Sequence, residues 1–106
     1  MTTIEIYYII RDGNSNNYLR FGINVTILDS ARKHGISDVD MLSIVYDPYV
    51  VVEIRPDPRK TLFLGFDSKA RPIEVITDTG TDGQEYVIHA DKMTKQYESL
   101  LEEIIR

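Results

Sequence analysis

Four apolar segments follow one another between residues 49 and 90, and only short turn-forming runs separate them. Each segment is rich in β-branched or aromatic residues, which is typical of β-strands. The expected strands are Tyr49–Arg55, Lys60–Phe66, Pro72–Asp78 and Gln84–Ala90. Parallel neighbours need a crossover of a dozen or more residues, and these connections are much shorter. The spacing therefore predicts a four-stranded antiparallel meander.

Helical signals flank this expected meander on both sides. Thr26–His34 is expected to form a short helix, and Ser37 is expected to cap a second helix that ends before Pro48. After the strands, apolar residues recur at helical spacing over Asp91–Arg106, which predicts a closing helix capped by its first residue. The sequence thus predicts an α+β fold with two N-terminal helices, the four-stranded meander and a C-terminal helix.

The first 22 residues look like an addition to this unit. Ile4–Ile10 alternates apolar and polar side chains as a short strand does, and the polar run at 11–18 is typical of a loop. We therefore expect an appended strand and loop over residues 1–22 and one domain over 23–106. The length of 106 residues fits a single core. A further hypothesis is that aromatic side chains of the appended segment stack on single-stranded nucleic acid.

The composition limits the chemistry that the chain can perform. It has no cysteine, which excludes disulfides, cysteine-ligated zinc and thiol catalysis. Its two histidines are far apart in sequence and its carboxylates are scattered, so we expect neither a metal site nor a cofactor. No apolar run approaches the roughly 20 residues that span a bilayer, and the N-terminus lacks the pattern of a signal peptide. We expect a cytoplasmic protein with no membrane partner.

The charge balance bears on the partners. Twelve Lys and Arg against 17 Asp and Glu give a net charge of −5, whereas phosphate-binding proteins usually carry an excess of cations. A local basic patch can still act. Five cations flank the first two expected turns of the meander: Arg55, Arg59, Lys60, Lys69 and Arg71. They form either an edge that contacts phosphate or solvated turns whose charge neighbouring carboxylates cancel.

One acid–base pair is predicted on the sheet. A turn centred near Gly80 and Thr81 brings the strand that carries Glu74 back beside the strand that carries His89. A carboxylate beside an imidazole fixes its tautomer, which suits general acid–base catalysis, but an ordinary surface ion pair is the alternative. His34, at the end of the first expected helix, belongs either to a small basic patch or simply complements the helix dipole.

Four short motifs carry a resemblance to a known family. They are Ser-Ala-Arg-Lys-His-Gly-Ile-Ser at 30–37, Thr-Leu-Phe-Leu-Gly-Phe-Asp at 61–67, Pro-Ile-Glu-Val-Ile at 72–76 and Val-Ile-His-Ala at 87–90. Their order and spacing, over about residues 25–106, resemble the small toxins of bacterial type II toxin–antitoxin pairs, particularly the BrnT-like group of the RelE/ParE superfamily. The resemblance implies a RelE-like fold and a metal-independent ribonuclease that a cognate antitoxin protein holds inactive.

The resemblance also implies roles for particular residues. It makes His89 the general base or acid, poised by Glu74, and it brings Lys60, Lys92 and Arg59 to the scissile phosphate. The other residues expected to bind RNA are Arg71, Lys95, His34 and Tyr97. RNA, alone or on the ribosome, is then the substrate. The alternative is a non-catalytic protein-interaction module, or a gyrase-directed toxin, on the same fold.

Overall fold

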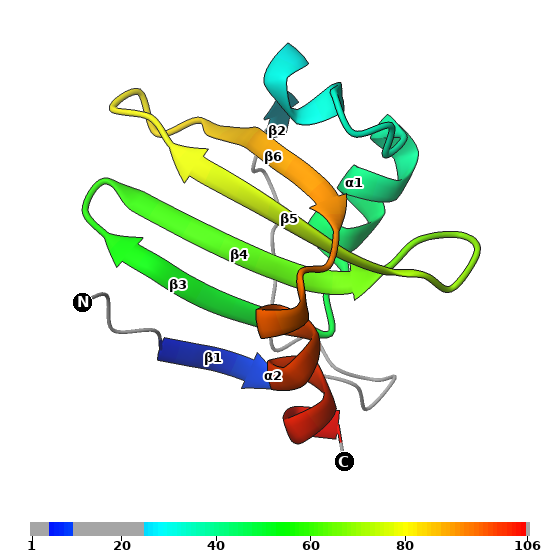
Figure 1. Cartoon of the computed structure of the whole chain (residues 1–106). Coiled ribbons are helices and arrows are strands. Elements are labelled where there is room, and N and C mark those ends of the chain that lie inside the picture. The colour runs from blue at the N-terminus through cyan, green and yellow to red at the C-terminus, as the bar shows by residue number, and fades with distance from the viewer. Residues whose placement is uncertain (1–4, 10–24, 106) are drawn as a thin grey trace.

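The structure, a computed structural model, describes residues 5–9 and 25–105. Within these residues a six-stranded sheet has the order β1-β3-β4-β5-β6-β2. The strands are β1 (Glu5–Ile9), β2 (Val25–Ile27), β3 (Val50–Pro56), β4 (Arg59–Phe66), β5 (Pro72–Thr79) and β6 (Glu85–Lys92). The helical elements are the 3-10 turn η1 (Asp29–Arg32) and the α-helices α1 (Asp38–Tyr46) and α2 (Lys95–Ile105), as Figure 1 shows.

The predicted fold class is wrong in both the sheet and the helices. The sheet has six strands instead of four, because β1 pairs antiparallel with β3 at one edge and β2 pairs parallel with β6 at the other. The first expected helix, Thr26–His34, is instead a short strand followed by a 3-10 turn of four residues. Val25, Thr26 and Ile27 are all β-branched, and such residues favour an extended backbone over a helix. The RelE-like fold that the resemblance implies, with two N-terminal helices and a four-stranded meander, is therefore wrong as well.

The closing helix begins later than expected. Strand β6 continues to Lys92, and α2 starts at Lys95. The ladder between β5 and β6 extends to the pair of Ile73 and Lys92, so the backbone groups of this stretch are already bonded within the sheet. Asp91 is therefore a strand residue and does not cap the helix.

The two faces of the sheet carry separate apolar clusters. The face under η1 and α1, called here the α1 face, holds a cluster that includes Met41, Ile44, Phe63, Val75 and Val87. The opposite face, called the α2 face, holds a cluster that includes Val52, Leu62, Leu64 and Leu101. In Figure 1, α2 lies in front of the sheet and α1 behind it. Alternation of side chains along β3, β4 and β5 supplies both clusters from the same strands.

Helix α1 is fixed at its start and packs closely on the sheet. The Ser37 hydroxyl accepts a hydrogen bond from the Asp40 N–H at 3.1 Å, which satisfies one of the unpaired donors of the first turn. A Cβ atom on Gly65 of β4 would lie 3.1 Å from Cγ1 of Ile44. The glycine therefore allows the helix to approach β4 more closely than another residue would.

A bulge in β6 decides which face of the sheet His89 occupies. His89 pairs with Ile76, whereas the next pair along the two strands involves Val87, so Ile88 is an extra residue between the pairs. Strict alternation would put His89 on the same face as Val87, whose side chain is buried in the cluster of the α1 face. The extra residue moves His89 to the α2 face, which Glu74 also occupies.

The expected division at residue 22 stays a prediction. Strand β1 pairs with the edge of the sheet at β3, as an added edge strand would. The polar run at 11–18 and the side chains of the aromatic hypothesis lie outside what the structure describes. No helix within residues 5–9 and 25–105 is long and apolar enough to cross a membrane.

Candidate active site

Glu74 is a buried carboxylate at the middle of the candidate site. Its side chain is only 4% exposed, and Oε2 lies 2.9 Å from Nε2 of His89. Oε1 accepts the backbone N–H of Thr94 at 2.7 Å. Because burying a carboxylate without partners is costly, these two contacts are what make Glu74 tolerable at this position. Thr94 directly precedes α2, so the carboxylate also lies at the positive end of that helix.

His89 presents its second ring nitrogen away from Glu74. An ionised carboxylate only accepts hydrogen bonds, so Nε2 carries the proton in that state and Nδ1 is left as the basic nitrogen. Within the described part of the chain, no group forms a hydrogen bond with Nδ1. The side chain is 31% exposed, so the imidazole is open to solvent. The predicted Glu74–His89 pair is thus present, and its geometry suits proton transfer.

His34 brings a second imidazole to the first. Its ring stands edge-on to that of His89, with 5.8 Å between the ring centroids and an interplanar angle of 71°. Nδ1 of His34 lies 3.6 Å from Oδ2 of Asp91 on β6, a contact that becomes an ion pair when the ring is protonated. The helix-dipole interpretation of His34 loses its basis, because the preceding element is a four-residue 3-10 turn. Sequence reasoning missed Asp91, because a residue before an expected helix resembles a cap.

Tyr97 of α2 also lies near Glu74. It packs against the apolar cluster of the α2 face. Burial, and to a smaller extent the charge of Glu74, raise the pKa of the Tyr97 phenol. The phenol therefore stays neutral at physiological pH and can donate a hydrogen bond. Of the residues expected to bind RNA, Tyr97 and His34 are brought to the Glu74–His89 pair.

Lys60 lies beside Asp78 rather than beside His89. It is paired with Asp78 in the ladder between β4 and β5, whereas His89 is paired with Ile76, two residues or about 7 Å along β5. Strand β5 also lies between the strand of Lys60 and the strand of His89. The expected contact of Lys60 with a phosphate bound at His89 stays a prediction.

The two remaining lysines of the predicted set differ in position. Lys92 pairs with Ile73, whose side chain is buried in the cluster of the α1 face, so alternation places Lys92 on the face opposite His89. Lys95 is exposed at the first position of α2, next to the residue whose N–H binds Glu74. Lys95 is thus a cation that the fold places beside the site, and Lys92 is not.

The three arginines near the first turns of the meander are each paired with a carboxylate. The distances are 3.2 Å for Arg55–Asp78, 3.8 Å for Arg59–Glu53 and 2.7 Å for Arg71–Asp67. This arrangement agrees with the alternative in which neighbouring carboxylates cancel the charge of the arginines. Glu53 comes from the strand next to that of Arg59, and Asp78 comes from β5, two strands away from Arg55, so only the strand order and register reveal these two carboxylates.

Asp67 holds the connection between β4 and β5 together. Its side chain is only 1% exposed. Its oxygens accept the backbone N–H groups of Lys69 and Arg71, both at 2.9 Å, and the Arg71 guanidinium at 2.7 Å. The backbone bond from Arg71, together with the guanidinium and the Lys69 N–H, lowers the pKa of the Asp67 carboxyl.

Acid is expected to weaken the fold partly through Asp67. In the unfolded chain this carboxyl takes up a proton near its ordinary pKa of about 3.9, before the folded chain does, so falling pH favours unfolding there. The free energy of unfolding should thus fall below about pH 4 more steeply for the natural chain than for Asp67→Asn. Urea unfolding between neutral and acidic pH measures this. Asp57→Asn, on an exposed turn, is the control and should follow the natural chain. If the free energy of unfolding falls equally steeply with pH in Asp67→Asn and in the natural chain, the role given to Asp67 is contradicted.

Fold and site together define an α+β domain with two imidazoles and two carboxylates at the end of its sixth strand. No group of three or more His, Cys, Asp or Glu side chains that could hold a metal ion occurs among the described residues. Comparisons with protein-family models, curated proteins and solved structures find no match to this chain. The resemblance to BrnT-like toxins therefore stays a prediction from the sequence motifs.

Proposed function

We propose that this chain is a metal-independent ribonuclease in which His89 and His34 are the acid–base pair. The observation that carries the proposal is the contact of the two imidazoles, 5.8 Å between centroids, each beside a carboxylate. Cleavage of RNA by its own 2′-hydroxyl needs one group that removes a proton and another that supplies one. Two neighbouring imidazoles, held by different carboxylates, meet this need.

The two contacts with carboxylates support different roles for the imidazoles. Glu74 binds Nε2 of His89, which leaves Nδ1 to accept the proton of the 2′-hydroxyl. Asp91 lies 3.6 Å from Nδ1 of His34, which leaves Nε2–H of the protonated His34 ring to donate. His89 is therefore the general base and His34 the general acid.

The proposed reaction is an internal transfer of the phosphodiester. The 2′-oxygen attacks the adjacent phosphorus, so the P–O2′ bond forms and the P–O5′ bond breaks. The 2′ proton passes to His89, and His34 gives its proton to the departing 5′-oxygen. The products are a 2′,3′-cyclic phosphate and a 5′-hydroxyl end, and solvent returns the two imidazoles to their starting protonation states.

Two exposed cations support phosphate binding next to the imidazoles. Lys33 directly precedes His34, and Lys95 begins α2 beside the Glu74 contact. Transfer at phosphorus depends mainly on positioning and on stabilising the charge of the phosphorane. These lysines would offset locally the net charge of −5 of the whole chain.

Purified protein, an RNA oligonucleotide and EDTA test this proposal. We expect cleavage in the presence of EDTA, with 2′,3′-cyclic phosphate and 5′-hydroxyl ends identified by mass spectrometry. The matched substrate, methylated at every 2′-oxygen, should stay intact because it lacks the attacking hydroxyl. The proposal fails if neither the protein alone nor the protein with ribosomes cleaves RNA, if the methylated substrate is cleaved, or if EDTA abolishes the reaction.

The cellular role in the proposal is that of a cytoplasmic toxin with a cognate antitoxin protein. It is supported by the sequence motifs around His34, Glu74 and His89 and by the proton-transfer geometry of the same residues. Expression of the natural chain in bacterial cells without its antitoxin is expected to arrest growth. Harmless expression, together with no RNA cleavage in vitro, would instead favour the non-catalytic interaction module.

A further inference from the structure

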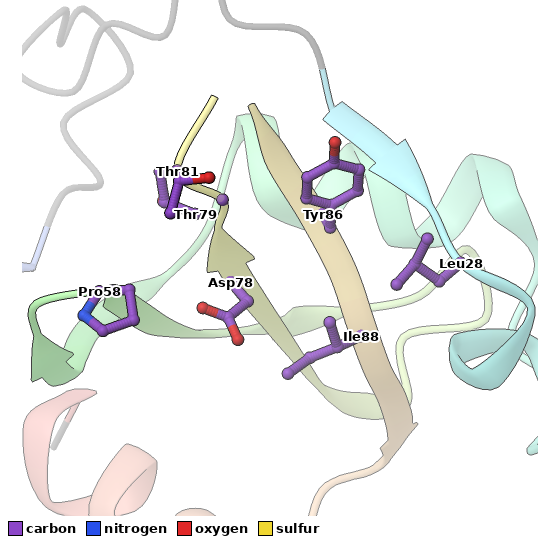
Figure 2. A pocket seen from close by; sticks show the side chains of 8 residues that line it. Leu28, Pro58, Asp78, Thr79, Thr81, Tyr86 and Ile88 are labelled. Carbon is purple, nitrogen blue, oxygen red and sulfur yellow. The ribbon is translucent and has the colours of Figure 1, made fainter. Parts of the chain in front are cut away.

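A pocket of about 320 Å³ opens on the α2 face of the sheet. Figure 2 shows Asp78 of β5 beside Tyr86 and Ile88 of β6, with Leu28 and Pro58 on opposite sides of them. The walls are therefore mainly apolar, with one carboxylate among them. A volume of this size lies at the lower end of the range for small-ligand sites, roughly 300–1,000 Å³.

The pocket adjoins the candidate active site. Ile88 lines the pocket and is the bulge residue that directly precedes His89. Asp78 lies two residues along β5 from Ile76, which pairs with His89, and this separation is about 7 Å along the strand. One nucleotide can bridge such a distance, with its base in the pocket and its ribose at His89.

The carboxylate of Asp78 retains capacity to accept hydrogen bonds. Its Oδ1 accepts one hydrogen bond from Nη2 of Arg55 at 3.2 Å. Among the residues that the structure describes, none donates a hydrogen bond to its Oδ2. Arg55 also offsets the negative charge, so the carboxylate does not strongly repel an RNA strand. A ligand with two adjacent N–H donors can therefore bind at Asp78.

The ring of Tyr86 is held in place at the pocket wall. Its hydroxyl donates to Oδ2 of Asp82 at 2.9 Å. This hydrogen bond, followed by burial, raises the pKa of the Tyr86 phenol, so the group stays neutral. A fixed aromatic ring and aliphatic neighbours suit the flat faces of a nucleobase, which proteins commonly bind by stacking.

We propose that this pocket binds guanine and makes the chain cleave RNA after guanosine. The inference rests on the proposed ribonuclease function and names the base that the same site selects. The N1–H and the N2 amino group of guanine are adjacent donors that match one carboxylate. Adenine, cytosine and uracil do not present two adjacent donors on their pairing edge. The ribose of the bound guanosine then supplies the 2′-hydroxyl to His89.

Binding of the four nucleoside 3′-monophosphates, measured by calorimetry, tests the pocket directly. We expect guanosine 3′-monophosphate to bind about 10- to 100-fold more tightly than the other three. Asp78→Asn should abolish this preference, because the amide presents a donor to one of the two guanine N–H groups. Glu102→Gln, the same change of charge on the exposed surface of α2, is the control and should retain it. Equal affinity for the four nucleotides, or a preference that survives in Asp78→Asn, would overturn the proposal.

A second test of the pocket uses the natural chain, so its result does not depend on whether a variant folds. Guanosine 3′-monophosphate should shift the backbone amide resonances of Asp78, Tyr86 and Ile88, and shifts confined to other regions would overturn the pocket assignment. RNA products should end in guanosine 2′,3′-cyclic phosphate. Cleavage without base preference would contradict the guanine site but not the ribonuclease function. Selective guanosine binding without cleavage would contradict the ribonuclease function but not the guanine site, so the two failures are distinguishable.

Discussion

Replacing His89 by glutamine is expected to lower the rate of RNA cleavage by about 10²- to 10⁴-fold, the usual contribution of a general base. Glutamine is chosen because its amide can still donate a hydrogen bond to the buried Glu74 carboxylate, which otherwise loses the partner at 2.9 Å. The variant should therefore fold, and the loss should fall on kcat. Steady-state cleavage of a fluorogenic RNA measures both kcat and KM, and circular dichroism checks the fold.

The pH profile separates a catalytic role from a structural one. The natural chain should show a bell-shaped dependence of kcat/KM on pH, since one imidazole must be neutral and the other protonated. His89→Gln should lose the acidic limb and His34→Gln the alkaline limb. Gln96→Ala, on the exposed surface of α2, is the control and should behave as the natural chain. Retention of more than about a tenth of the rate in His89→Gln would contradict the assignment of the base.

Replacing Phe63 by alanine is expected to lower the free energy of unfolding by about 3–5 kcal/mol. Phe63 is 0% exposed in the central strand β4 and belongs to the cluster under α1. The substitution removes a whole ring and leaves a cavity that the neighbouring strands cannot fully close. Because a domain of this size is typically stable by about 5–15 kcal/mol, the loss is a large part of the total. Chemical denaturation at neutral pH measures it.

A matched truncation on the surface controls for this effect. Val39 of α1 is 76% exposed, so Val39→Ala should change the free energy of unfolding by no more than about 0.5 kcal/mol. A loss below about 1 kcal/mol in Phe63→Ala would mean that the cluster of the α1 face does not pack as the structure describes.

Local patterns predicted the positions of several elements. The short turn-forming runs between residues 49 and 90 require antiparallel neighbours, and strands β3 to β6 pair in that way. Ser37 at the start of α1 is a further example, since a hydroxyl placed before an apolar run binds a nearby backbone N–H. These features depend on neighbours in sequence, so they are visible without the fold.

The edges of the sheet were not predictable in the same way. The three residues of β2 pair with residues of β6 that lie sixty positions further along the chain, and such a short segment has no periodicity of its own. The two-helix interpretation failed there because the local pattern of Thr26–His34 allows both a helix and a strand. The contact with β6 decides between them.

The sequence alone determined that Glu74 and His89 lie on neighbouring strands, since a short turn after β5 leaves no other arrangement. Only the tertiary structure decided that they meet. An extra residue at Ile88 reverses the alternation and brings His89 to the face of Glu74. The approach of His34 to His89 is likewise a tertiary fact, because it depends on η1 lying against the edge of β6. Side-chain alternation is a local rule, whereas a bulge and an edge contact arise from pairing with distant strands.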